Sequence, residues 1–356
     1  MKRCILHIGM HKTGSSSIQQ SLKNFASKDF RYARLLKTPN HSGAIIQAFS
    51  ESIRNQWRGS DHPIYGQKDI AQRVKARLEK QLKRAKADTL IVSGEGIPSL
   101  TLKEIDALKQ FIGKYVSQTI VVCYIRLPES YMNSAAQQRI KAGLDAFDFS
   151  AFYPSYRDRL EKFDQLFGQE NVKLWTFNSK LLKNGCVVSD FCARFGIDIP
   201  SEDIVRVNES LSLNALSLLY SYHKHARNSA DLINEDSKSY ALLVQSLVDL
   251  KGGKFRLSPE LIAPIIKKNY SDIDWMEQRL GESLKVPIAP IESYVSSESD
   301  LLSPSDAAIH WLLEKLDNSY SQLHTEDISL AVAKHVHLLR QKLSDSSLSH
   351  YATRLV

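Results

Sequence analysis

The sequence predicts an α/β protein, in which a parallel sheet is flanked by helices and followed by a mostly helical C-terminal part. Continuous apolar runs alternate with helical patterns in the first half of the chain, which is typical of strands buried on both faces of a parallel sheet. From about Leu211 onward, helical patterns dominate. With 356 residues, of which 43% are hydrophobic and 24% charged, the chain can bury a full core.

Four apolar runs are the candidate strands, and they lie within residues 3–9, 88–96, 118–130 and 171–177. Amphipathic patterns between them predict helices from Ser15 onward and over residues 72–86, 102–115 and 156–168. Another helix is expected from Pro128 to Gly143, because proline suits a first helical turn and glycine suits an exit.

The charge balance favours an acidic partner. A formal net charge of +8 and an isoelectric point near 9.1 suit a nucleotide, an anionic glycan, a nucleic acid or a membrane surface. The basic stretch 72–86 could bind a polyanion, but its apolar stripe of Val74, Leu78 and Leu82 predicts a solvated helix packed on a core.

Cysteine and histidine usage indicates neither disulfides nor a metal site. The four cysteines lack CxxC spacing, and a helix would not place His335 and His337 on one face. Every apolar run is too short for a signal peptide or a membrane span. We therefore expect a reduced, cytoplasmic protein with no transmembrane segment and no metal requirement.

Residues 7–22, HIGMHKTGSSSIQQSL, join the first predicted strand to the first predicted helix. Gly9 and Gly14 have the glycine spacing of a Walker A loop, G-x-x-x-x-G-K-[ST], but Gly14 is followed by Ser15 and Ser16, and the lysine is Lys12. Amides at a helix N-terminus still point at an anion, and Lys12 is placed to neutralise an oxygen that bridges two anionic groups. The sequence therefore predicts a P-loop-like sheet with a phosphate-binding loop after its first strand. The structural alternative is a simple Gly/Ser turn before a helix.

Arg126 and Ser134 form a second pattern. Arg126 follows the run TIVVCYI, at the carboxyl end of a strand, where open α/β sheets bind ligands. Ser134 comes eight positions later, on the helix that this strand feeds. A guanidinium and a hydroxyl that converge there suit a phosphate monoester, although such a pair alone is more often structural.

Together these motifs resemble those of PAPS-dependent sulfotransferases, with most similarity to the bacterial, carbohydrate-type branch related to heparan-sulfate sulfotransferases. GMHKTGSSSIQ is similar to their 5′-phosphosulfate loop, and IRLPESYMNS is similar to their 3′-phosphate motif. Looser similarity continues through SGEG, VNESLSLNALSLL and IIKKNYSDIDWMEQRLG, so that the resemblance covers about residues 1–281.

The resemblance implies 3′-phosphoadenosine 5′-phosphosulfate (PAPS) as the donor, PAP as the product, and no obligatory metal. It implies that Lys12 contacts the bridging oxygen and the departing phosphate, and that Arg126 and Ser134 bind the 3′-phosphate. The remaining members of the implied 5′-phosphate cradle are Thr13, Gly14, Ser15, Ser16 and Ser17.

The domain boundaries follow from the resemblance and from composition. We expect a sulfotransferase domain over residues 1–292 and a helical C-terminal extension over residues 307–356. The Ser-rich, acidic stretch 293–306 between them predicts a linker.

Transfer to a hydroxyl needs a group that takes its proton. Glu95 is the first candidate, because it follows the run TLIVSG and should emerge at the same sheet edge as the loop. The glycines on either side of it are expected to leave room for a substrate. A salt bridge from Glu95 to Lys12 or Arg139 is the structural alternative, and His11 and His41 are weaker candidates for the base.

Two further sets of residues leave their roles open. The first set is Gln138, Arg139 and Lys141. These side chains either reach toward the donor or an anionic acceptor, or they form a solvated helix face. The second set is Asn208, Ser210 and Ser212. These residues either cap the following helix or help to hold the nucleotide. The acceptor-binding loops, including residues 37–63, carry no decodable motif.

These observations predict a sulfotransferase that moves the sulfuryl group of PAPS, by in-line transfer, to a hydroxyl on a carbohydrate or glycoconjugate, without a nucleic-acid partner. One alternative is a P-loop small-molecule kinase, which the missing G-K-[ST] and the missing magnesium-binding acid disfavour. The other is a non-catalytic protein that binds a nucleotide or a polyanion.

Overall fold

The computed structural model describes residues 2–51, 69–83, 87–144, 146–207, 210–226, 237–284, 294–317 and 327–352, with side chains described as far as residue 345. The chain divides into two compact units. The first unit comprises Met1–Leu127, Ser155–Asn208 and Tyr270–Val286, and the second comprises Pro128–Pro154, Glu209–Asn269 and Pro287–Val356.

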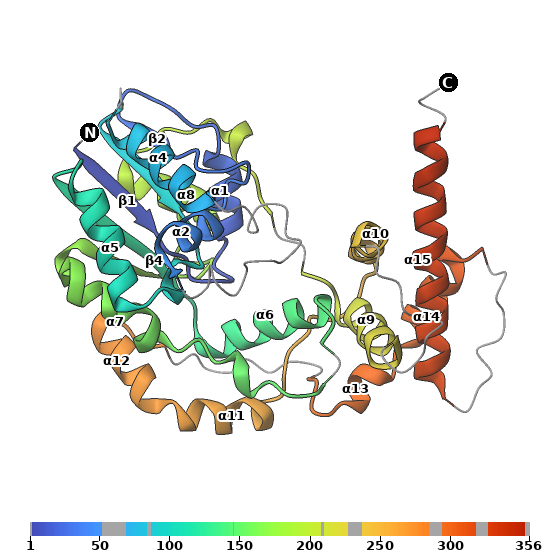
Figure 1. The fold of residues 1–356 in the computed structure, drawn as a ribbon. Helices are drawn as coiled ribbons and strands as arrows, with labels where there is room; N and C mark the ends of the chain where they lie inside the picture. Colours follow the sequence, from blue (N-terminus) through green and yellow to red (C-terminus); the bar gives the residue numbers. More distant parts are fainter. Residues whose placement is uncertain are drawn as a thin grey trace. The chain divides into compact units, whose positions relative to one another are not determined.

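A parallel sheet with the strand order β2-β3-β1-β4-β5 forms the centre of the described first unit (Figure 1). Its strands are β1 (Arg3–His7), β2 (Phe30–Tyr32), β3 (Thr89–Ser93), β4 (Gln118–Ile125) and β5 (Val172–Thr176). The α/β fold class and the four predicted strands are confirmed. The sequence did not reveal β2, because three residues at the edge of a sheet carry no periodic signal.

Helices cover both faces of this sheet (Figure 1). On one face, α1 (Ser15–Leu22) and α8 (Val187–Phe195) bury their apolar residues against Ile5, Ile91 and Val122. Neighbouring strand residues such as Leu6 and Cys123 point by alternation to the other face, where α5 (Leu102–Gly113) and α7 (Tyr156–Phe167) contact the strands and each other. The other helices of this unit are α2 (Ser42–Phe49), α4 (Ile70–Lys83) and α12 (Tyr270–Leu280).

Local sequence signals explain several helix ends. Thr101 and Glu104 form a capping box at the start of α5, and Gly168, with φ of 79°, ends α7. In α4, Val74, Leu78 and Leu82 are buried, which confirms the packed-helix interpretation of the basic stretch as far as Lys83, while residues 84–86 lie outside the described residues. Short 3₁₀ turns occur at Ile97–Ser99, Ser150–Phe152, Gln169–Asn171, Lys183–Gly185, Ser201–Asp203 and Leu247–Asp249.

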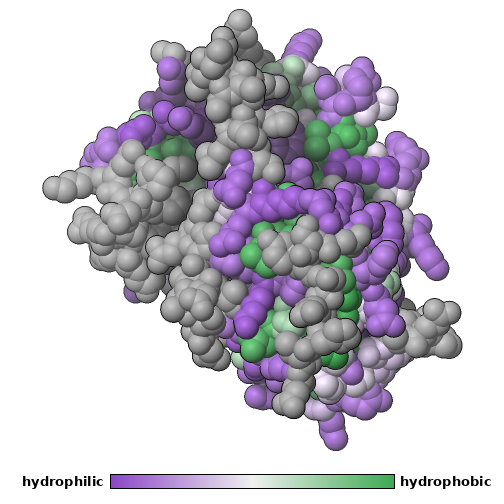
Figure 2. Space-filling view, turned by 90° about the vertical axis from the view of Figure 1, so that its right-hand side faces the viewer, coloured by the Kyte–Doolittle hydropathy of each residue, from purple (hydrophilic) through white to green (hydrophobic). Residues whose placement is uncertain are grey.

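The second unit is helical in its described part and has its own core. It contains α6 (Pro128–Lys141), α9 (Leu213–Ala226), α10 (Ser237–Ser246), α11 (Pro259–Lys268), α13 (Ser299–Leu302), α14 (Asp306–Lys315) and α15 (Ile328–Ala352). The central helix is α9, which is buried from Ala215 to Tyr222 and packs against α15, α13 and α6. In Figure 2, hydrophilic residues dominate the visible described surface, and small hydrophobic areas lie between them.

The unit boundaries differ from the boundaries expected at residues 292 and 307. In the stretch expected to be a linker, Val295 is buried and bridges to Leu257, and Leu301 of α13 belongs to the same core. Val332 and Val336 of α15 pack into that core as well. Residue 293 lies outside the described residues. That residues 1–292 fold as one sulfotransferase domain stays a prediction.

Candidate functional site

The loop after β1 has a backbone that requires its two glycines. Gly14 is left-handed, with φ of 75°, and a Cβ there would lie 2.6 Å from Cγ1 of Val187. Gly9, with φ of 103°, lies so close to Glu95 that the two Cβ atoms would be 2.9 Å apart. Both positions therefore combine a positive φ with a close neighbour, and any other residue would be strained there.

Most hydroxyl groups of the loop bind the protein itself. Thr13 and Ser15 donate to the carbonyl of Met10 at 2.6 and 3.1 Å, and Ser17 Oγ accepts a hydrogen bond from the amide of Val207 at 3.0 Å. The amides of Ser17 and Ile18 donate to the Gly14 carbonyl at 3.0 and 3.2 Å, whereas the amides of Ser15 and Ser16 precede the first helical acceptor, and Ser16 is exposed. An anion at this helix N-terminus would therefore meet backbone amides and the Ser16 hydroxyl first.

Arg126 holds the loop from the neighbouring strand end. Its Nη1 donates to the carbonyl of Lys12 at 2.5 Å, and its guanidinium lies over the ring of Phe177, 5.7 Å from the centroid. Lys12 itself is left-handed, with φ of 66°, and partly buried. Because a guanidinium carries five N–H donors, the contact to Lys12 leaves the predicted binding of a phosphate by Arg126 chemically open.

Ser134 lies on α6, which belongs to the second unit, and is partly buried. Its predicted pairing with Arg126 at one phosphate therefore rests on the sequence pattern and stays a prediction. On the same helix, Gln138 and Arg139 are exposed. Ser212 accepts a hydrogen bond from the amide of Ala215 at 3.2 Å, which supports its role as a helix cap. Asn208 lies outside the described residues.

Glu95 follows β3 at the same edge of the sheet as the loop, as the parallel topology requires. Both of its carboxylate oxygens accept a hydrogen bond from a neutral amide: Oε2 from Gln19 Nε2 at 2.7 Å, and Oε1 from Asn40 Nδ2 at 3.0 Å. These two contacts fix the plane of the carboxylate. Each oxygen keeps a further lone pair, so Glu95 can still accept a proton.

The glycines beside Glu95 serve a different purpose from the one that the sequence predicted. A Cβ on Gly94 would lie 2.6 Å from the Ser42 amide nitrogen, and a Cβ on Gly96 would lie 2.9 Å from Ser42 Cβ. The space was expected to admit a substrate, but the N-terminus of α2 occupies it. Ser42 Oγ accepts a hydrogen bond from the Gly96 amide at 2.9 Å, which ties this part of residues 37–51 to the site. Residues 52–63 lie outside the described residues.

The histidines near Glu95 differ in their ability to act as a base. His41 is buried, its Nδ1 accepts a hydrogen bond from the Ser93 amide at 3.0 Å, and its Nε2 bonds the carbonyl of Ala33 at 3.0 Å. Both ring nitrogens of His41 are therefore engaged, and burial lowers its pKa to about 4. Hence the structure does not support His41 as the base.

His11 remains an alternative candidate for the base. It is partly buried, and burial is the largest cause of its lowered pKa. The charges of Arg159 and Lys12 lower the pKa of His11 further, whereas Glu95 acts in the opposite direction. These effects also show that charged groups of the loop, of the β3 end and of α7 lie around His11.

Gln19, Asn40 and Arg159 also lie near Glu95 or His11, and none of them was predicted as a site residue. Gln19 is 2% exposed and stands on the buried side of α1, beside Ile18 and Leu22. A polar residue in an apolar helix stripe was the available signal, since buried polar groups need a partner. Asn40 and Arg159 carried no such signal, because their surroundings depend on distant segments.

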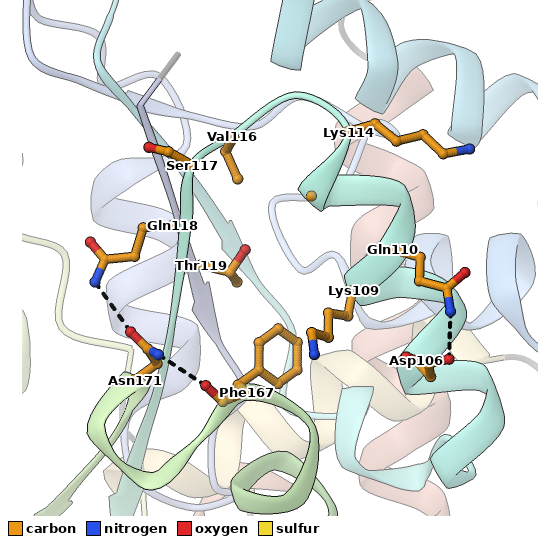
Figure 3. A pocket seen from close by; sticks show the side chains of 11 residues that line it. Asp106, Lys109, Gln110, Lys114, Val116, Ser117, Gln118, Thr119, Phe167 and Asn171 are labelled. Atoms are coloured by element: carbon orange, nitrogen blue, oxygen red, sulfur yellow. Dashed lines mark hydrogen bonds between the residues drawn. The ribbon is translucent and has the colours of Figure 1, made fainter.

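A pocket of about 640 Å³ lies at the opposite edge of the sheet, where β4 begins (Figure 3). Its polar side chains largely bond one another or nearby backbone: Gln118 donates to Asn171 at 3.2 Å, Asn171 donates to the Phe167 carbonyl at 2.9 Å, and Gln110 donates to Asp106 at 2.7 Å. Because it lies where β4 begins, whereas the loop and Glu95 follow the ends of β1 and β3, the pocket is separate from the candidate site.

No described helix is both long enough and apolar enough to cross a membrane. Within the same described residues, no group of three or more histidine, cysteine, aspartate or glutamate side chains could hold a metal ion.

The described first unit is thus a parallel, helix-covered α/β unit that carries a glycine loop, an arginine and a glutamate at the carboxyl edge of its sheet. No family model matches the chain. A stretch of 132 residues is 29% identical to an uncharacterized protein of Archaeoglobus fulgidus, and the match spans 36% of this chain and 36% of that relative. Among solved structures, the chain is similar to a sulfotransferase from Alicyclobacillus acidocaldarius, with 13% identity and a TM-score of 0.42 over 80% of this chain and 97% of the other.

Proposed function

We propose that this protein is a sulfotransferase that moves the sulfuryl group of PAPS to a hydroxyl of a carbohydrate or glycoconjugate. The observation that carries the proposal is the direct contact between the loop with the displaced lysine and a glutamate oriented by two amides. Gly9 and Glu95 touch, and Lys12 follows Gly9 by three residues in the same loop. A phosphate-binding loop and a candidate base thus share one sheet edge.

These residues suit an in-line transfer. As the acceptor oxygen forms its bond to sulfur, the bond between sulfur and the donor's phosphate oxygen breaks, and the electron pair of that bond leaves with the phosphate. Lys12 would offset the charge that grows on the departing phosphate, and amides at the start of α1 would bind the phosphate group. Glu95 would take the proton of the acceptor hydroxyl.

The kinase alternative finds less support at the strand ends. A magnesium-dependent P-loop enzyme places an acid there and a lysine directly after the second glycine. Here β3 ends at Ser93, β4 is followed by Arg126, and Gly14 is followed by Ser15. The proposal of sulfuryl transfer rests on this combination of a retained glycine loop with a different arrangement of charged groups.

A transfer assay tests the proposal. The protein is incubated with sulfur-labelled PAPS and a panel of defined glycans, and mass spectrometry detects products that are heavier by one sulfate. The Lys12→Ala variant serves as the control for protein-dependent transfer. Magnesium-dependent consumption of ATP without sulfated product would support the kinase. PAP binding without transfer to any member of the panel would support a non-catalytic binding protein.

A further inference from the structure

One face of α7 lies over the strand ends that form the candidate site. Tyr156 donates from its hydroxyl to the carbonyl of Arg126, directly after β4, at 2.5 Å. Two turns further on, Lys162 donates to the carbonyl of Pro98, shortly after β3, at 2.6 Å. Arg159 stands between them on the same helix face, three residues from each. Because β1 lies between β3 and β4 in the sheet, Arg159 is placed over the loop that follows β1.

Arg159 is partly buried, and its guanidinium has no hydrogen-bond or ion-pair partner among the described residues. Its neighbours on the helix differ: Arg157 binds Glu161 at 2.8 Å, and Lys162 binds the Pro98 carbonyl. Charged groups that leave water are normally paired, because the loss of hydration is costly. A partly buried arginine that has no partner in the described part of the chain is therefore suited to bind an anion at this edge.

The anion at Arg159 would differ from the phosphate at the start of α1. Helix α1 packs on the face of the sheet that includes Ile5 and Val122, whereas α7 packs on the opposite face. The amides of α1 and the guanidinium of Arg159 therefore approach the loop from two sides of the sheet. His11 and Lys12 belong to this loop, directly before α1, and the charges of Lys12 and Arg159 both lower the pKa of His11.

We propose that Arg159 binds an anionic substituent, a carboxylate or a sulfate ester, on the sugar that carries the accepting hydroxyl. This inference rests on the proposed function and narrows the acceptor to an anionic carbohydrate. The nearby Glu95 would repel the same anion, so the substituent would have to lie on a different carbon from the hydroxyl that reacts. Arg159 would bind and orient the acceptor, and it would take no part in the proton transfer.

A pair of sugars that differ at one carbon tests this assignment. Calorimetry measures the binding of 4-nitrophenyl β-D-glucuronide and 4-nitrophenyl β-D-glucoside to the full chain, with and without PAP. The wild type should bind the glucuronide about tenfold or more tightly than the glucoside, as expected for one charge-assisted, partly desolvated contact. Arg159→Gln should abolish most of this preference, and Arg159→Lys should retain part of it.

Arg157→Gln is the matched control, because it removes the same charge from an exposed position on the same helix. It should keep the wild-type preference. Equal affinities for the two glycosides in the wild type, or equal losses in Arg157→Gln and Arg159→Gln, would overturn the inference. Binding of PAP is the separate readout for the proposed function. An intact glucuronide preference without PAP binding would leave the anion site standing and would refute the sulfotransferase proposal.

Discussion

Replacing Glu95 by glutamine tests whether Glu95 is the base. The same change also perturbs the two hydrogen bonds that its carboxylate accepts. Gln19 and Asn40 each donate to one carboxylate oxygen, at 2.7 and 3.0 Å. A glutamine side chain has one acceptor oxygen, so its amide nitrogen would face one of these donors. Gln19 Nε2 also donates to Ser93 Oγ at 3.3 Å, but that hydroxyl could donate to a rotated Gln19 amide instead. Asn40 Oδ1 accepts the Ser42 backbone amide at 2.8 Å and would lose that bond on rotation. We therefore expect Gln19 to adjust in the Glu95→Gln variant.

The chemical effect should be much larger than the structural one. Loss of a general base lowers turnover by roughly 10² to 10⁴, which corresponds to about 3–5 kcal/mol in the barrier. Rearranging one partly buried hydrogen bond costs about 1 kcal/mol of unfolding free energy. PAP affinity should stay nearly unchanged, because amides of the loop and α1 would hold the phosphate.

The assay compares turnover at saturating PAPS, PAP affinity by calorimetry, and unfolding by denaturant. Glu104→Gln is the matched control, since Glu104 also accepts a hydrogen bond, in the exposed capping box of α5. It should lower stability by about 1 kcal/mol or less and leave turnover intact. If Glu95→Gln behaves like Glu104→Gln, Glu95 has a structural role and the base must be sought elsewhere, first at His11.

Three further predictions follow from the same edge of the sheet. Lys12→Ala should lower turnover by about 10² or more while PAP binding falls much less, and unchanged turnover at saturating PAPS would remove Lys12 from the mechanism. Arg126→Ala should weaken PAP more than AMP in calorimetry, and Ser134→Ala should do the same by about 1 kcal/mol. Equal losses for both nucleotides would indicate a structural role for Arg126, to which its contact with the Lys12 carbonyl contributes. Burial lowers the pKa of His41 from 6.5 to about 4, so the unfolded chain binds the proton first as pH falls. The unfolding free energy should therefore drop between pH 6.5 and pH 4, by up to about 3 kcal/mol for this residue, and a His41→Gln variant with the same pH dependence would contradict this.

The fold was predictable because its signals are local and strong. Each main strand is a continuous apolar run, and parallel strands bring their carboxyl ends to one edge, so the loop, Glu95 and Arg126 could be placed there in advance. The contacts of Glu95 could not be predicted. Its partners lie 76 and 55 residues away, and no local pattern reports which distant amide will reach a carboxylate.

The division into two units was not visible in the sequence either. The apolar stripe of α6, formed by Met132, Ala136 and Ile140, is the same whether the helix packs on a sheet or on other helices. Only the folded chain shows that this stripe joins the core around α9. The glycines around Glu95 were misread for a related reason, because a glycine indicates close approach but does not identify the approaching group.

The charges around Glu95 are distributed in a way that supports transfer rather than simple anion binding. The side chains that hold the carboxylate are neutral amides, and the buried His7 and His41, whose pKa values burial lowers to about 4, are uncharged at neutral pH. Positive charge comes instead from Lys12 in the loop and from Arg159 on α7. A binding site for a polyanion would gain nothing from a carboxylate in contact with its loop, since the carboxylate repels the ligand. A transferase gains a proton acceptor from it, because the acceptor hydroxyl must lose its proton while the departing phosphate gains charge near Lys12. The placement of Glu95 against Gly9 therefore favours the enzyme over the non-catalytic alternative.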